Sequence, residues 1–114
     1  MTPLSNRGVS IAILVLAAAL EAGGDAIVRK ALHSQAQWTR FALFAAGAVI
    51  LLAYGYTVNA PAWDFSSLLG LYVVFFFVIA QLMSWLLFGQ PPSTAVMIGG
   101  GLITTGGMVI AFAT

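Results

Sequence analysis

The chain contains no cysteine and very little charge. Of its 114 residues, four are lysine or arginine, three are aspartate or glutamate, and one is histidine. The absence of cysteine excludes disulfides, thiol nucleophiles and zinc–thiolate sites. A net charge of +1 without any basic run does not favour a nucleic-acid partner. A soluble domain of this length needs a charged exterior, and these few charged side chains cannot provide one.

Apolar residues make up 61% of the chain and gather in four segments, at about 8–28, 41–58, 67–88 and 94–112. A helix rises ~1.5 Å per residue, so about 20 residues cross the ~30 Å hydrocarbon core of a bilayer. We therefore predict an all-α membrane protein, with four transmembrane helices in a single domain (residues 1–114), which dimerises. We expect a multi-pass protein of the plasma (inner) membrane.

The first segment has a second interpretation. Arg7 precedes an apolar run with small residues at 17–19, as in a cleavable signal peptide. The run is long for such a peptide and three further segments follow, which favours a membrane helix. Arg29, Lys30 and Arg40 flank the first connector, so the basic residues weakly favour an external N-terminus. A bias this small is compatible with insertion in both directions and with antiparallel dimers.

Two carboxylates interrupt the first apolar segment, and inserting one near the middle of a bilayer costs about 2.5 to 3.5 kcal/mol on insertion scales. Glu21 and Asp25 are four residues apart and share one helix face. A low dielectric and a neighbouring like charge both disfavour an ionised carboxyl. Glu21 is therefore expected to bind and release protons. A cationic substrate that competes for the same carboxylate would be exchanged for those protons.

Asp25 also has a simpler explanation, because Arg29 lies four residues further along the same helix face. An ion pair between them near the interface would leave Asp25 without a functional role. Glu21 lies one turn deeper and has no basic residue at helical spacing. The residues three to four positions from Glu21 are small, which predicts a groove open to another helix or a ligand: Ala17, Ala18 and Gly24.

The third segment combines aromatic and polar side chains. Tyr72 and Trp85 are candidates for substrate binding, because an aromatic face attracts an organic cation by about 0.5 to 2 kcal/mol. Gln81 is a further candidate, since Gln81 and Ser84 are polar, lie in mid-segment and are expected to face neighbouring helices. Three consecutive phenylalanines at 75–77 are interpreted as lipid-facing bulk.

The fourth segment is rich in glycine. Gly99 and Gly106 are seven residues apart, as are Gly100 and Gly107, so two stripes of small residues run along the predicted helix. Such stripes predict close helix packing, either within the protomer or between two protomers. The sequence contains no spacing typical of a nucleophile, metal or phosphate-loop site, so we predict no enzymatic activity, no cofactor and no metal.

Several residues carry a likeness to a known family: Glu21 with Arg29 eight residues later, residues 84–90 (Ser-Trp-Leu-Leu-Phe-Gly-Gln), and Gly99 with Gly106. In their order and spacing the chain resembles the small multidrug resistance family, a four-helix branch of the drug/metabolite transporter superfamily. The resemblance implies an antiparallel homodimer that exports cations, such as quaternary ammonium compounds or guanidinium, in exchange for protons. It implies that Glu21 of both protomers forms the shared site and that Tyr72 contacts substrate.

The chain departs from the pattern of this family at several positions. Tyr72 stands where the family usually has tryptophan, and Leu69 where it has tyrosine. Val74 and Phe76 replace glycines thought to let the third helix bend, and bulky residues stiffen a helix. Asp25 is an additional acid. Related four-helix members are subunits of lipid-linked sugar flippases, so the alternative prediction is a non-catalytic membrane partner, or a flippase subunit for a lipid-linked substrate, in a heteromer.

Overall fold

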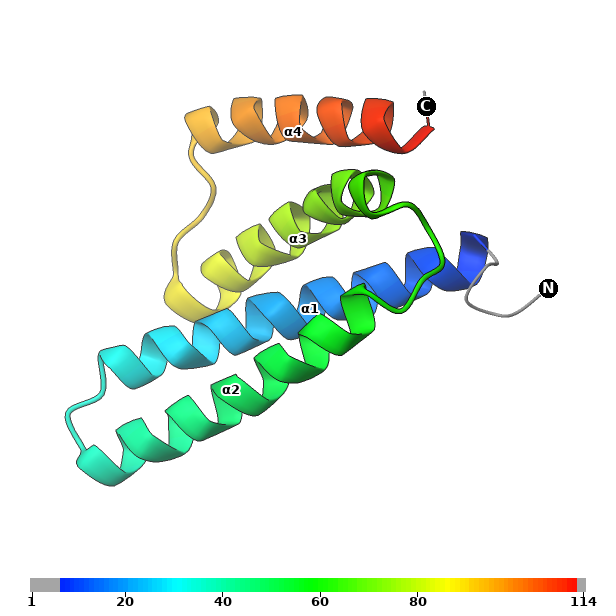
Figure 1. Ribbon diagram of the computed structural model, residues 1–114. Coiled ribbons are helices and arrows are strands. Elements are labelled where there is room, and N and C mark those ends of the chain that lie inside the picture. The colour runs from blue at the N-terminus through cyan, green and yellow to red at the C-terminus, as the bar shows by residue number, and fades with distance from the viewer. Residues whose placement is uncertain (1–6, 113–114) are drawn as a thin grey trace.

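The computed structural model describes residues 7–112, which form four α-helices joined by short connections (Figure 1). The helices are α1 (Arg7–Leu32), α2 (Gln37–Val58), α3 (Phe65–Phe88) and α4 (Thr94–Phe112). Each of the four is long and apolar enough to cross a membrane. The prediction of an all-α membrane protein with four transmembrane helices is confirmed.

Three helices extend beyond the apolar segments that predicted them. The first continues to Leu32 instead of residue 28, the second begins at Gln37 instead of 41, and the third begins at Phe65 instead of 67. The added residues include arginine, lysine and glutamine, which are good helix formers. Hydropathy marks the part of a helix that lies in hydrocarbon, whereas the backbone hydrogen bonds continue into the polar boundary. The fourth helix has the predicted bounds.

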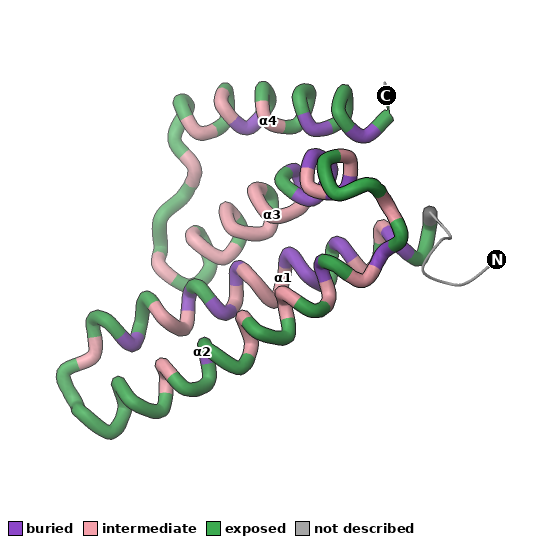
Figure 2. The backbone as a smooth tube through the Cα atoms, viewed as in Figure 1, coloured by how far each residue is buried: buried purple, intermediate pink, exposed green. Residues whose placement is uncertain are grey.

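The helices form an open layer. α1 packs against α2 on one side and α3 on the other, and α4 packs against α3 (Figure 1). The Cα atoms extend 49 × 37 × 18 Å, so the layer is thin in one direction. Much of α2 and α4 is therefore exposed (Figure 2). The exposed residues include large apolar ones such as Leu52 of α2 and Leu102 of α4. An apolar surface of this extent suits contact with lipid or with another membrane helix.

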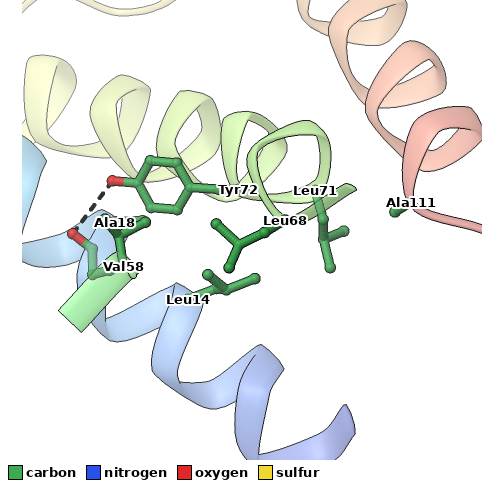
Figure 3. Close-up of a cluster of buried hydrophobic side chains, with 8 residues drawn as sticks. Leu14, Ala18, Val58, Leu68, Leu71, Tyr72 and Ala111 are labelled. Atoms are coloured by element: carbon green, nitrogen blue, oxygen red, sulfur yellow. Dashed lines mark hydrogen bonds between the residues drawn. The ribbon is translucent and has the colours of Figure 1, made fainter. Parts of the chain in front are cut away.

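The buried core lies at one end of the layer, where the first half of α1 meets the start of α3. Figure 3 shows the Tyr72 ring of α3 beside Leu14 of α1 and Leu68 of α3. The second half of α2 and the end of α4 reach the same cluster. Its buried members are Leu14, Ala17, Ala18, Val58, Leu68, Leu71, Tyr72 and Ala111.

Glycines set the distance between α3 and α4. A Cβ atom at Gly107 would lie only 2.5 Å from the carbonyl oxygen of Gly70, and one at Gly100 would lie 2.5 Å from the Phe77 ring. A Cβ atom at Gly99 or Gly106 would meet nothing within 4 Å. One of the two predicted glycine stripes thus packs within the protomer, while the other faces away from it.

Residues 84–90, which carry the most specific part of the sequence motif, form the C-terminal end of α3 and its cap. Gly89 has a φ of 62°, the left-handed conformation that favours glycine because other residues carry a Cβ. The N–H of Gly89 donates to the Trp85 carbonyl and the N–H of Gln90 to the Ser84 carbonyl, both at 3.1 Å. This hydrogen-bonded cap ends the helix and turns the chain toward α4.

Two adjacent glycines test the packing of α3 on α4. We expect Gly107→Ala to reduce the free energy of unfolding by about 1 to 3 kcal/mol, because its methyl group overpacks against the Gly70 backbone. Gly106→Ala should be neutral or stabilise by up to about 1 kcal/mol, since alanine favours helix and the space is open. Unfolding of both variants in detergent, titrated with dodecyl sulfate, measures the difference. Equal effects would contradict this packing.

Candidate functional site

A hydrogen bond between α1 and α3 forms the centre of the site. Glu21 lies near the middle of α1 and is half-buried. The Tyr72 hydroxyl donates to the Oε1 atom of Glu21 at 2.7 Å, although the two residues are 51 positions apart in the chain. The same hydroxyl lies 3.4 Å from the carbonyl oxygen of Ala17, a longer contact. The structure therefore brings together two residues that the sequence singled out separately.

Small side chains on α1 make this approach possible. Ala17 and Ala18 are fully buried, and Tyr72 packs over them with only 4% of its surface exposed. Gly24 lies against α2, where an added Cβ would come within 2.8 Å of two Leu51 side-chain carbons. The groove of small residues predicted around Glu21 is thus filled by the protein's own helices, α3 on one side and α2 on the other.

Three aromatic rings form a row beside the hydrogen bond, with Tyr72 in the middle and Tyr54 and Phe76 on either side of it. The ring centroids of Tyr54 and Tyr72 are 5.8 Å apart, and those of Tyr72 and Phe76 are 6.2 Å apart with nearly parallel planes. Stacked and tilted rings at these distances attract each other and hold their neighbours in position. Two helices meet in this row, because α2 contributes Tyr54 and α3 contributes the other two rings, and the hydrogen bond of Tyr72 with Glu21 joins α1 to them.

Tyr54 is a residue of the site that the sequence analysis did not single out. A signal was available in its spacing. Gly47 and Val58 are the buried residues of α2, and Tyr54 lies seven positions after the first and four before the second. These intervals place all three on one helix face.

The interpretation of residues 75–77 as lipid-facing bulk is wrong for all three phenylalanines, since Phe75 and Phe76 pack against the buried cluster and Phe77 against α4. Phe76 stacks on Tyr72, and Phe77 packs against Gly100 of α4. All three are half-buried. Successive side chains on a helix point about 100° apart, so a run of three cannot share one environment.

Asp25 lies one turn from Glu21 and is exposed, in a cleft between α1 and α3. Within residues 7–112 it makes no ion pair with Arg29, so the simpler explanation of Asp25 does not hold in this structure. The Arg29 guanidinium instead lies 5.6 Å from the centre of the Phe88 ring. A cation over an aromatic face is attracted to it, and this contact draws Arg29 across the cleft to α3.

Gln81 and Trp85 lie apart from Glu21. They line a groove of about 320 Å³ between α3 and α4, together with Gly100. Ser84, which is expected to face a neighbouring helix as Gln81 does, lines the cleft on the α1 side. Residues three positions apart differ by about 60° around a helix, so near the boundary between two contact faces of α3 one can face α4 and the other α1.

The arrangement at Glu21 suits binding of a proton or a small cation. A carboxylate in an apolar setting gains from either partner, because both remove an uncompensated charge from low dielectric. The Tyr72 hydroxyl can donate or accept, so it satisfies Glu21 in both protonation states. Within residues 7–112, no three histidine, aspartate or glutamate side chains lie close enough together to hold a metal ion.

Comparisons with known proteins add no family or relative. Protein-family models, curated proteins and solved structures were compared with the chain, and none of them matches it.

A double-mutant cycle tests the hydrogen bond between Tyr72 and Glu21. We expect Tyr72→Phe and Glu21→Ala to be coupled by about 0.6 to 1.7 kcal/mol in unfolding free energy, the range of hydrogen bonds between membrane helices. Tyr56→Phe is the matched control, because Tyr56 is 82% exposed and removal of its hydroxyl should have no effect. Additive effects of the two substitutions would show that the bond does not contribute to stability.

Proposed function

We propose that this protein is a small proton-coupled transporter that exports a cationic or amphipathic small molecule by proton antiport at Glu21. The observation that carries the proposal is the half-buried carboxylate of Glu21, hydrogen-bonded to Tyr72 inside a layer of four membrane-spanning helices. A carboxylate at this depth is costly and is kept where it binds an ion or proton. The resemblance of the sequence to the small multidrug resistance family supports the same activity.

Exchange follows from competition for one carboxylate. When Glu21 is ionised, it accepts the Tyr72 hydrogen bond and attracts a cation, while the neighbouring aromatic faces favour an organic one. When a proton binds, the negative charge is lost and the cation is released. Because proton and cation exclude each other, a proton gradient drives the substrate in the opposite direction. Asp25, one turn away and exposed, would add negative charge along the route to Glu21.

We propose that the active form is a homodimer, antiparallel as the resemblance implies, in the plasma (inner) membrane. Gly99 and Gly106 of α4 support a contact between protomers, because they form a stripe of small residues with open space in front of it. Close approach of helix backbones along such stripes is a common way for membrane helices to associate. A second copy would also cover part of the open layer and enclose Glu21 more fully.

Transport by purified protein in proteoliposomes tests the proposal, with guanidinium and tetraethylammonium as probes. We expect Glu21→Gln to abolish proton-driven uptake, because glutamine still accepts the Tyr72 hydrogen bond but carries no exchangeable charge. Asp64→Asn is the matched control, since this acid lies in the connection before α3 and should leave transport intact. Unchanged uptake in Glu21→Gln would overturn the proposal.

A second candidate is a non-catalytic membrane partner, or a flippase subunit for a lipid-linked substrate. The exposed apolar surface of α2 favours it, because this helix packs mainly against α1 and leaves large apolar side chains such as Leu52 exposed for contact with a different protein. Purification without detergent exchange, which preserves bound partner chains, would distinguish this candidate from the transporter. A partner chain in fixed stoichiometry, together with no proton coupling by the isolated protein, would favour the heteromer.

A further inference from the structure

A second polar feature lies between α1 and α3, one turn beyond Glu21. A cleft of about 270 Å³ opens between the second halves of the two helices. Its polar lining comes from Asp25 and Arg29 of α1 and from Ser84 and Gln90 at the end of α3, and its aromatic lining from Phe76 and Phe88. Glu21 does not line it, so the cleft is separate from the carboxylate proposed for proton exchange.

Asp25 and Arg29, the two opposite charges of this cleft, do not form an ion pair with each other. Asp25 and Arg29 stand one helical turn apart, the spacing at which such residues usually pair. Among residues 7–112, however, the Asp25 carboxylate has no hydrogen-bond or ion-pair partner. The Arg29 guanidinium instead lies over the Phe88 ring, 5.6 Å from its centre. A guanidinium that makes no ion pair keeps its N–H groups for an oxygen ligand.

This charge pattern selects a particular kind of ligand. A simple cation bound at Asp25 would be repelled by Arg29, and a simple anion at Arg29 would be repelled by Asp25. A ligand that carries both charges satisfies both residues at once.

The position and size of the cleft point to a headgroup. The ends of α1 and α3 lie on the same side of the molecule, beside the polar connections at 33–36 and 89–93 (Figure 1). Lys30 stands next to the cleft, with its Nζ atom 5.9 Å from the Phe88 ring. Sites for drug-sized ligands usually measure about 300 to 1,000 Å³, and this cleft is smaller.

We propose that this cleft binds a small dipolar group that carries an amine and a phosphate or carboxylate. Asp25 takes the amine, Arg29 takes the anionic group, and the apolar carbons between them lie over Phe76. The ligand is either a free dipolar molecule or the headgroup of a zwitterionic lipid, which share this chemistry. The proposal goes beyond transport at Glu21, because binding in the cleft requires neither proton exchange nor Glu21.

Calorimetric titration of the protein in dodecyl maltoside, a non-ionic detergent, tests the proposal for a free ligand. We expect phosphoethanolamine to bind at least about tenfold more tightly than ethanolamine or inorganic phosphate, each of which satisfies one residue only. Asp25→Asn and Arg29→Gln should each weaken binding of phosphoethanolamine about tenfold or more. Lys30→Gln is the matched control, because it removes a cation beside the same ring without changing the lining of the cleft.

A second arm of the experiment tests the lipid source. Protein is reconstituted into vesicles of phosphatidylethanolamine and phosphatidylglycerol and extracted in dodecyl maltoside, and the co-purifying lipid is analysed. Enrichment of phosphatidylethanolamine that Asp25→Asn and Arg29→Gln abolish supports a lipid headgroup as ligand. Binding of phosphoethanolamine without such enrichment supports a free ligand.

Several results would overturn the proposal. One is a failure of both probes, phosphoethanolamine and phosphatidylethanolamine, to bind. Another is binding of ethanolamine or inorganic phosphate as tight as that of phosphoethanolamine. A third is an equal loss of binding in Lys30→Gln, which would indicate a general effect of positive charge. Because none of these measurements involves a proton gradient, their failure is distinguishable from a failure of transport at Glu21.

Discussion

The hydrogen bond from Tyr72 to Glu21 is the constraint on which the rest of the structure depends. It places a phenol and a carboxylate 2.7 Å apart across the contact of α1 with α3. Glu21 would otherwise be an uncompensated charge in an apolar helix, and Tyr72 a buried hydroxyl without a strong acceptor. Ala17 and Ala18 are needed for the bond, because larger side chains would hold α3 away from α1. The bond and the buried cluster around it thus hold α3 against α1.

The same helix carries two carboxylates in different environments. Glu21 faces a tyrosine and the core, whereas Asp25 is exposed beside a cleft that also contains Arg29. One turn of helix thus separates a site suited to a single exchangeable charge from one suited to a pair of opposite charges. The Phe88 ring maintains this division, since it attracts Arg29 away from Asp25.

The sequence predicted the number and class of the helices well, because four apolar segments of sufficient length have few alternatives. It also identified Glu21 and Tyr72, but as separate candidates. Their contact joins residues 51 positions apart and depends on which helices are neighbours, which hydropathy does not specify. The same limit explains the separation of Gln81 from Ser84. The position of Arg29 depends on a ring at the far end of α3, and no local pattern in α1 indicates it.

The central claim is that proton and cation compete for Glu21, and proton release on cation binding tests it most directly. Purified protein in weakly buffered detergent is titrated with guanidinium or tetraethylammonium over a range of pH, and the change in pH is recorded. The account predicts release of protons on binding by the native protein, and none by Glu21→Gln. Cation binding without proton release at any pH, or equal release by Glu21→Gln, would contradict it.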